Sequence, residues 1–143
     1  MTKKLGLLLT IAGIAAPAFA DPITDARSEI LGKRDRHWIV KDMIVFKGAA
    51  KQCASGESYR FAADGTAERT ICANGKLSAS KMSWTLKVDR RGDVVMHLND
   101  QDYAISFGAR DGARAMRLQS IAPPTPHSKV SETTEIYMRP AGR

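Results

Sequence analysis

Apolar and polar residues alternate with a two-residue period from Gly32 to the end of the chain, the pattern typical of half-buried β-strands. The alternation is clearest from residue 82 to residue 107 and continues at Met116 and Leu118, and polar turns at 89–92, 99–101 and 110–112 divide residues 82–118 into four strands. The apolar positions on one face of these strands are Met82, Trp84, Leu86, Val88, Val94, Met96, Leu98, Tyr103, Ile105, Phe107, Met116 and Leu118. A parallel connection needs about a dozen residues. We therefore expect four neighbouring antiparallel strands.

Four further strands are predicted outside this region, at residues 37–47, 59–61, 67–73 and 134–138. Two of the intervening turns, Asp64-Gly65 and Asn74-Gly75, are dipeptides that suit hairpins with positive φ. The prolines in residues 123–126 predict an extended, unpaired linker before the last strand. Whether that last strand completes the sheet or docks elsewhere stays open from the sequence.

A short helix is predicted before the first strand. Apolar residues recur at near-helical spacing over residues 23–32, with Asp21 or Thr24 as the N-cap and Gly32 as the stop. The expected fold is an all-β, eight-stranded antiparallel up-and-down barrel with this N-terminal helix, because closure alone removes the exposed edges of a sheet. A β-sandwich is the alternative, although sandwiches usually need longer connections between their sheets.

The first twenty residues differ from all that follow. Two lysines precede an apolar run at residues 5–15, and an Ala-Phe-Ala sequence ends at Ala20, which together predict a secretory signal peptide. The run is about half the roughly 20 residues that a transmembrane helix needs, and no later segment is longer, so we expect no membrane span. Residues 21–143 are then a single β-barrel domain in the periplasm or outside the cell.

The chain has two cysteines, Cys53 and Cys72, both in the predicted exported part. An even number of cysteines in an oxidising compartment predicts a disulfide, which would stabilise the fold by about 3 kcal/mol on the chain-entropy model. A redox-active pair is the alternative. Such pairs usually have the closer C-x-x-C spacing.

Basic residues exceed acidic ones, 22 to 15, and removal of Lys3 and Lys4 with the signal peptide would leave a net charge of +5. The anions that an exported protein meets are lipid headgroups, envelope polysaccharide and acidic ligands, so we expect no nucleic-acid partner. Peripheral contact with an anionic envelope surface is one interpretation of this charge. The other is a solvated face that only keeps the protein in solution.

The inward face of the expected barrel allows two interpretations. In the first, the bulky side chains fill the interior completely, as is usual for close-packed cores. Alternatively, Trp38, Trp84 and Tyr103 line a narrow pocket near one mouth, where aromatic faces bind apolar groups. The second interpretation predicts a small apolar or amphiphilic ligand.

Two charged residues fall in phase with this apolar face. Arg114 precedes Met116 at strand spacing and is predicted to anchor an anionic ligand head at the barrel mouth, with a rim arginine facing water as the alternative. Asp42 lies in phase with Val40. Because an unpaired buried charge is costly, Asp42 and Arg114 are expected to meet, to lie at a rim, or to be turned by a bulge.

Catalytic and metal-binding patterns are lacking in the sequence. The serines have no nucleophile-elbow motif, and Asp100 and Asp102 lie in a polar stretch where turn chemistry explains them. His37, His97 and His127 lie on different segments without the spacing of a metal site. We therefore expect no enzyme, no metal and no cofactor.

Several residues at characteristic positions resemble the lipocalin-like small barrels of the calycin group. They are Leu31-Gly32, Trp38, Tyr59-x-Phe61-x-x-Asp64-Gly65-Thr66, Trp84-x-Leu86, Leu98 and Tyr103-x-Ile105. Five residues separate Gly32 from Trp38 here, whereas those barrels keep the two closer. This resemblance implies an eight-stranded barrel with a small apolar or amphiphilic ligand, which is our leading functional hypothesis.

The chain also resembles the small periplasmic inhibitors of secreted metalloproteases, which are signal-bearing eight-stranded barrels with one disulfide and an early tryptophan. Trp38, Trp84, Cys53 and Cys72 match these features. In that family the segment before the barrel enters the protease cleft, whereas residues 21–30 here are acidic and helical in pattern. This resemblance implies the alternative function, an inhibitor or accessory protein that contacts an envelope protein or secreted hydrolase through its surface.

Overall fold

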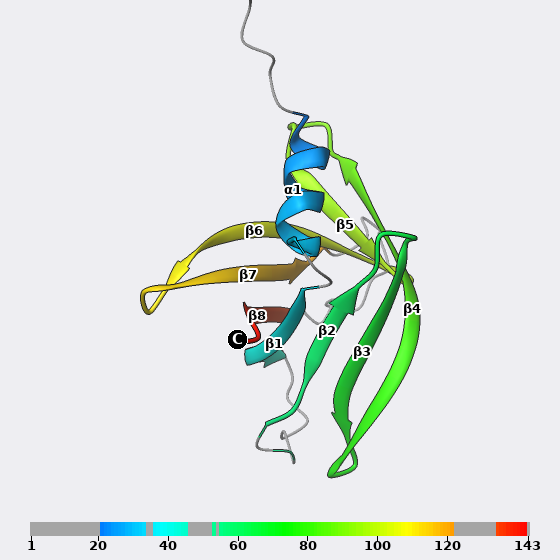
Figure 1. The fold of residues 1–143 in the computed structure, drawn as a ribbon. Coiled ribbons are helices and arrows are strands. Elements are labelled where there is room, and N and C mark those ends of the chain that lie inside the picture. Colours follow the sequence, from blue (N-terminus) through cyan, green and yellow to red (C-terminus); the bar gives the residue numbers. More distant parts are fainter. Residues whose placement is uncertain (1–20, 34–35, 46–52, 54, 122–133, 143) are drawn as a thin grey trace, which may run out of the picture.

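Eight antiparallel strands follow one another in chain order around a closed barrel, and one short helix precedes them (Figure 1). The elements are α1 (Pro22–Leu31), β1 (His37–Val45), β2 (Ser58–Phe61), β3 (Thr66–Ala73), β4 (Lys76–Val88), β5 (Val94–Leu98), β6 (Gln101–Arg110), β7 (Ala113–Ser120) and β8 (Thr134–Pro140). The computed structural model describes residues 21–33, 36–45, 53, 55–121 and 134–142. The predicted signal peptide and the proline-rich residues 123–126 lie outside this range. The predicted barrel is confirmed.

The last strand completes the ring. β8 pairs with β1 and with β7, so that Met138 lies opposite Val40 on one side and opposite Met116 on the other. The question that the sequence left open is thereby answered, and no sandwich forms.

The ends of α1 are capped as the sequence predicts. The Asp21 side chain accepts a hydrogen bond from the backbone N–H of Ile23 at 3.2 Å, and Gly32 ends the helix with a φ of 62°. Ile30 is fully buried, and its carbonyl oxygen accepts the indole N–H of Trp38 at 2.9 Å. The helix is therefore fixed to the first strand of the barrel.

The hairpin turns use positive φ angles. Asn74 and Gly75 have φ values of 50° and 73°, which confirms the predicted hairpin between β3 and β4. At Asp64-Gly65 only the glycine has positive φ, at 88°. There the Asp64 carboxylate accepts hydrogen bonds from the backbone N–H and the hydroxyl of Thr66, which stabilises a wider turn.

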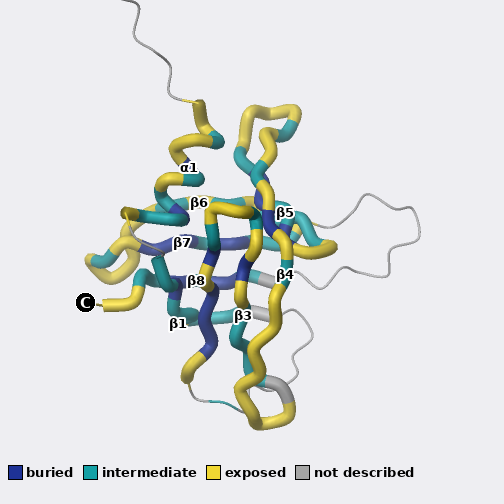
Figure 2. Tube along the Cα trace, turned by 45° about the vertical axis from the view of Figure 1, so that its right-hand side comes forward, coloured by how far each residue is buried: buried dark blue, intermediate teal, exposed yellow. Residues whose placement is uncertain are grey.

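Buried residues, coloured dark blue in Figure 2, form one core cluster that includes Ile30 of α1. The largest fully buried side chains are Trp38, Trp84, Tyr59, Phe61, Ile30, Met96, Met116, Leu118 and Met138. Val88 was predicted to share this face but is 41% exposed. The hairpin of β4 and β5 extends past the end of the barrel, so its last residues have no interior to face (Figure 2).

A bulge changes the phase of β1. The register with β8 shifts between Val40 and Asp42, and the Asp42 side chain is about half exposed. Its carboxylate lies 3.4 Å from the guanidinium of Arg110. The sequence analysis allowed Asp42 to meet Arg114, to lie at a rim, or to be turned by a bulge. The structure confirms the bulge, which turns Asp42 out of phase with Val40.

Candidate functional site

Trp38 and Trp84 lie in the core at the α1 end of the barrel. Their exposed fractions are 0% and 1%, and their indole N–H groups donate to the backbone carbonyls of Ile30 and Ala62. The ring of Phe61 packs edge-on against Trp84 at 5.2 Å. This part of the interior is filled by side chains, as in the first of the two interpretations above.

Tyr103 and Arg114, the other two predicted ligand contacts, lie far apart. In the register of β6 and β7, Tyr103 lies opposite Ser120, six residues along β7 from Arg114, which is roughly 20 Å. Arg114 is at the rim of the α1 end, where its Nε donates to the Glu29 carboxylate at 2.8 Å and half of its side chain is exposed. Tyr103 and Arg114 therefore lie at different heights in the barrel, and the roles of Trp38, Trp84, Tyr103 and Arg114 in ligand binding stay predictions.

The side chain that the sequence analysis missed is Arg69, in β3. It lies two residues from Ala67, which is 3% exposed, and directly opposite Tyr59, which is 2% exposed. Residues opposite one another on neighbouring strands project to the same side of a sheet. Arg69 therefore projects to the inner side of the barrel wall, in the same cross-strand row as Tyr59 and Trp38.

Arg69 forms no ion pair within 4.0 Å with a carboxylate of the described residues, although the buried Glu57 carboxylate is near enough to Tyr59 to act on its pKa. Its Nε is buried and has no hydrogen-bond partner there. The Nε of Arg117 is also buried without a partner, but the Arg117 guanidinium is ion-paired with Glu135. A buried charged group without an ion-pair partner is costly in free energy. Arg117 has such a partner in Glu135, whereas Arg69 has none among the described residues.

Two tyrosines lie near Arg69 inside the barrel. Burial raises the pKa of Tyr59 to about 12, while the charge of Arg69 and its hydrogen bond to the phenol oppose the rise. Burial also raises the pKa of Tyr103, and Arg69 again acts in the opposite direction. Two neutral phenol groups and one guanidinium thus face a common region and can donate hydrogen bonds to an anion.

The pKa of Tyr59 predicts a loss of stability at alkaline pH. Because the folded-state value exceeds the ordinary value of 10.0, the contribution is complete below pH 10 and disappears as pH rises towards 12, a loss of about 3 kcal/mol at most. Denaturation at successive pH values, combined with tyrosinate absorbance at 295 nm, measures it. The Tyr59→Phe variant should lose this pH dependence, and an unchanged dependence would contradict the assignment.

Glu57 and the disulfide hold this end of β2 and β3 together. Cys53 and Cys72 form the predicted disulfide, with their Cα atoms 5.7 Å apart. Glu57 is 6% exposed, and its carboxylate accepts the backbone N–H of Cys72 at 3.0 Å. These links fix the relative position of the strands that carry Tyr59 and Arg69.

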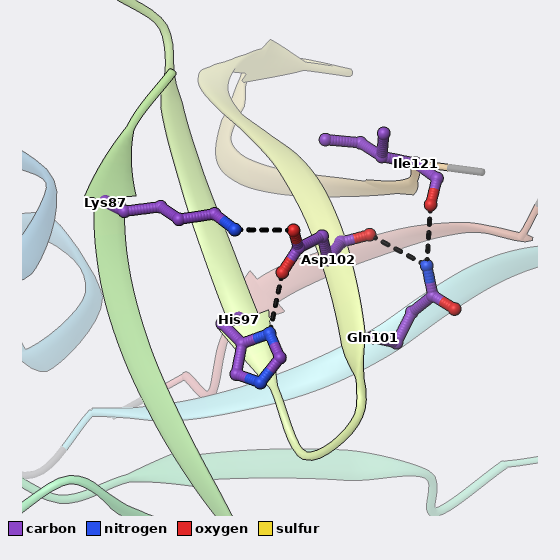
Figure 3. Close-up of polar contacts among 5 residues, drawn as sticks. All are labelled: Lys87, His97, Gln101, Asp102 and Ile121. Carbon is purple, nitrogen blue, oxygen red and sulfur yellow. Dashed lines mark hydrogen bonds and ion pairs between the residues drawn. The ribbon is translucent and has the colours of Figure 1, made fainter. Parts of the chain in front are cut away.

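A separate polar cluster lies on the outer side of the wall (Figure 3). The Asp102 carboxylate bonds to Nδ1 of His97 and to Nζ of Lys87, both at 2.6 Å, and these bonds, that of Lys87 first, lower the pKa of Asp102. Gln101 donates to the carbonyl of Ile121. Within the described part of the chain the side-chain partner of His97 is Asp102, with no nucleophile beside it. The cluster joins β4, β5 and β6, and we assign it a structural role.

Other types of site find little support in the described residues. No group of three or more His, Cys, Asp or Glu side chains is placed to hold a metal ion among them. In the same part of the chain no helix has the length and apolar character needed to cross a membrane. The interior group of Arg69, Tyr59 and Tyr103 is therefore the candidate site.

Comparisons with family models, with curated proteins and with solved structures gave no match to this chain. The resemblances to lipocalin-like barrels and to metalloprotease inhibitors stay predictions from the residues quoted above. The functional argument consequently depends on the side chains of the chain itself.

Proposed function

We propose that this barrel binds a small organic anion with an apolar group, and that Arg69 holds the anionic head. The observation that carries the proposal is the inward-facing Arg69 guanidinium, with a buried Nε and no carboxylate partner among the described residues. A carboxylate or phosphate can accept two parallel hydrogen bonds from a guanidinium. Such a ligand supplies the missing charge.

The surroundings of Arg69 support an amphiphilic ligand. The ring of Tyr59 stacks on Phe61 at 6.1 Å, so the polar group borders the apolar core directly. Tyr103 is partly buried, and its ring offers an apolar face next to a polar hydroxyl. We infer that the ligand head contacts Arg69 and the two phenols, and that its apolar part contacts the tyrosine rings.

We also propose that the protein acts in the periplasm or outside the cell. The Cys53–Cys72 disulfide supports an oxidising compartment, and the predicted signal peptide at residues 1–20 supports export. Anionic amphiphiles from the envelope are available there. No cofactor or catalytic step is part of the proposal.

Surface contact with an envelope protein or secreted hydrolase is the second candidate function. One observation favours it: the interior at the α1 end is occupied by side chains such as Trp38, Trp84 and Met116, all at most 1% exposed. In this case the barrel is only a scaffold, and Arg69 has no ligand.

Calorimetric titration with three ten-carbon probes tests the ligand proposal: decanoate, decanol and decyltrimethylammonium. Wild-type protein should bind decanoate and bind the neutral and cationic probes at least about tenfold more weakly, since a hydrogen bond to a charged group contributes about 1.5–3 kcal/mol. Arg69→Met keeps the length of the side chain and removes its charge. It should weaken decanoate binding by about ten- to a hundredfold while leaving the fold at least as stable.

Two further arginine variants make the result specific. Arg110→Met changes an outer-face arginine and should leave decanoate affinity unchanged. Arg114→Met tests the anchor predicted from the sequence. Loss of binding in Arg114→Met with full binding in Arg69→Met would move the site to the α1 end, and absence of binding in the wild type would overturn the ligand proposal.

A further inference from the structure

Among the described residues, the first half of β4 has a neighbouring strand on one side only. β4 pairs with β3 from Lys76 to Ser83 and with β5 from Trp84 to Val88. Figures 1 and 2 both show the β3–β4 hairpin projecting beyond the end of the barrel away from α1. Residues 76–81 are all exposed, and the apolar side chain of Leu77 is 49% exposed.

Two backbone hydrogen bonds identify which groups of β4 face its unpaired side. The N–H of Trp84 donates to Gly65, on the β3 side, and the carbonyl of Ser83 accepts from Asn99, on the β5 side. Because the direction alternates along a strand, the odd-numbered residues face away from β3. The N–H and C=O groups of Leu77, Ala79 and Lys81 therefore point outward, and they have no backbone partner among the described residues.

The opposite edge of the same hairpin is closed. On β3, the N–H of Cys72 lies beyond the end of β2 and would be free, but it donates to the Glu57 carboxylate. The disulfide to Cys53 covers the same position. The β4 edge has no equivalent protection within the described residues, so the two edges of one hairpin differ.

We propose that the free edge of β4, residues 76–82, binds an extended acidic segment of a partner protein as an added strand. Strand addition uses backbone hydrogen bonds for affinity and cross-strand side chains for selectivity. Lys76 and Lys81 form no ion pair with a described residue, although Glu68 of β3 lies directly opposite Lys81. β4 itself contains no acidic residue. Because the two lysines are an odd number of residues apart, they project to opposite faces, and an acidic side chain on the outer face of the added strand would face Lys81.

The same charges disfavour a second copy of the chain as the occupant. Two β4 edges would bring four lysines together with no carboxylate on either edge strand, and lysines on an edge strand are a common protection against self-pairing. The proposal does not depend on the ligand of Arg69, since the edge groups belong to the backbone of another strand.

Amide hydrogen exchange by NMR, with and without a synthetic peptide, tests the proposal. The probe is Ac-Thr-Glu-Val-Glu-Val-Glu-Thr-NH2, and the comparison peptide has lysine in place of each glutamate. In the free protein the amides of Leu77, Ala79 and Lys81 should exchange fast, while those of Ser78, Ser80 and Met82 are protected by β3. The acidic peptide should slow the three fast amides by at least roughly tenfold, and the basic peptide should not.

Variants separate strand addition from simple charge attraction. Ala79→Pro removes one outward N–H and no hydrogen bond to β3, so it should fold and bind the acidic peptide at least about tenfold more weakly. The matched control Ala79→Val keeps the N–H and should bind as the wild type does. Lys81→Glu should also weaken binding, as both models expect. If the proline variant fails to fold, slower exchange at Leu77, Ala79 and Lys81 but not at the residues between them decides in favour of strand addition.

Three results would overturn the proposal. The first is peptide binding without slower exchange at the alternate residues. The second is equal binding by wild type and a folded Ala79→Pro variant. The third is protection of the same three amides without peptide, accompanied by dimers in sedimentation experiments, which would identify a second copy as the occupant. Failure of decanoate binding would leave this proposal unaffected.

Discussion

Replacing Trp84 by alanine should lower the free energy of unfolding by about 3–5 kcal/mol, the range typical of removing a buried aromatic side chain. Trp84 is 1% exposed, packs edge-on against Phe61 at 5.2 Å, and donates its indole N–H to the carbonyl of Ala62. The guanidinium of Arg27 lies 5.1 Å from the centre of the Trp84 ring, between the helix and the barrel. The substitution therefore removes core volume and a link to α1 together.

Urea denaturation monitored by far-ultraviolet circular dichroism measures this effect. Val88→Ala is the matched control on the same strand, because Val88 is 41% exposed and its truncation should change stability by no more than about 0.5 kcal/mol. A loss of less than 1 kcal/mol in Trp84→Ala would mean that the end of the barrel covered by α1 is not the packed core described above.

Removing the disulfide should have the next largest effect. Cys53 and Cys72 are separated by 19 residues, and closure of a loop of this size stabilises the folded state by about 3 kcal/mol on the chain-entropy model. The bond also adjoins Glu57, which orders the strand ends beside Tyr59 and Arg69. The double variant Cys53→Ala, Cys72→Ala should therefore lose stability and decanoate affinity together.

Two comparisons make the disulfide result interpretable. Wild-type protein under a reducing agent should lose about the same stability as the double variant in urea denaturation. Gly108→Ala, on β6 and with open space where the added Cβ would lie, is expected to leave decanoate affinity unchanged. Equal stability of the oxidised and reduced wild type would contradict the prediction.

The fold followed from the sequence because its signals are local. Alternation over residues 82–107, the Asn74-Gly75 turn and the Asp21 and Gly32 caps each specify a short element without reference to the rest of the chain. Short connections then require antiparallel neighbours. Ring closure by β8 was the step that no local signal could supply, since it depends on a pairing with β1.

The candidate site was predicted less well. Arg69 was missed because apolar residues were used to identify the inward face, although Ala67 and Ile71 flank it at strand spacing and could have marked it. The alternation predicts that four side chains face inward: Trp38, Trp84, Tyr103 and Arg114. It does not predict how far along the barrel each one lies, because that position depends on the register between strands. The free edge of β4 also depends on register, because it results from the unequal lengths of β4 and β5.

The central claim is that an anionic ligand head binds the Arg69 guanidinium inside the barrel, and arginine Nε–H resonances report on it directly. In 15N-labelled protein titrated with decanoate, the resonance that is missing from Arg69→Met should shift progressively and saturate, while those of Arg110 and Arg114 stay in place. An Arg69 resonance that does not move at saturating decanoate, or an Arg114 resonance that moves instead, would contradict the claim.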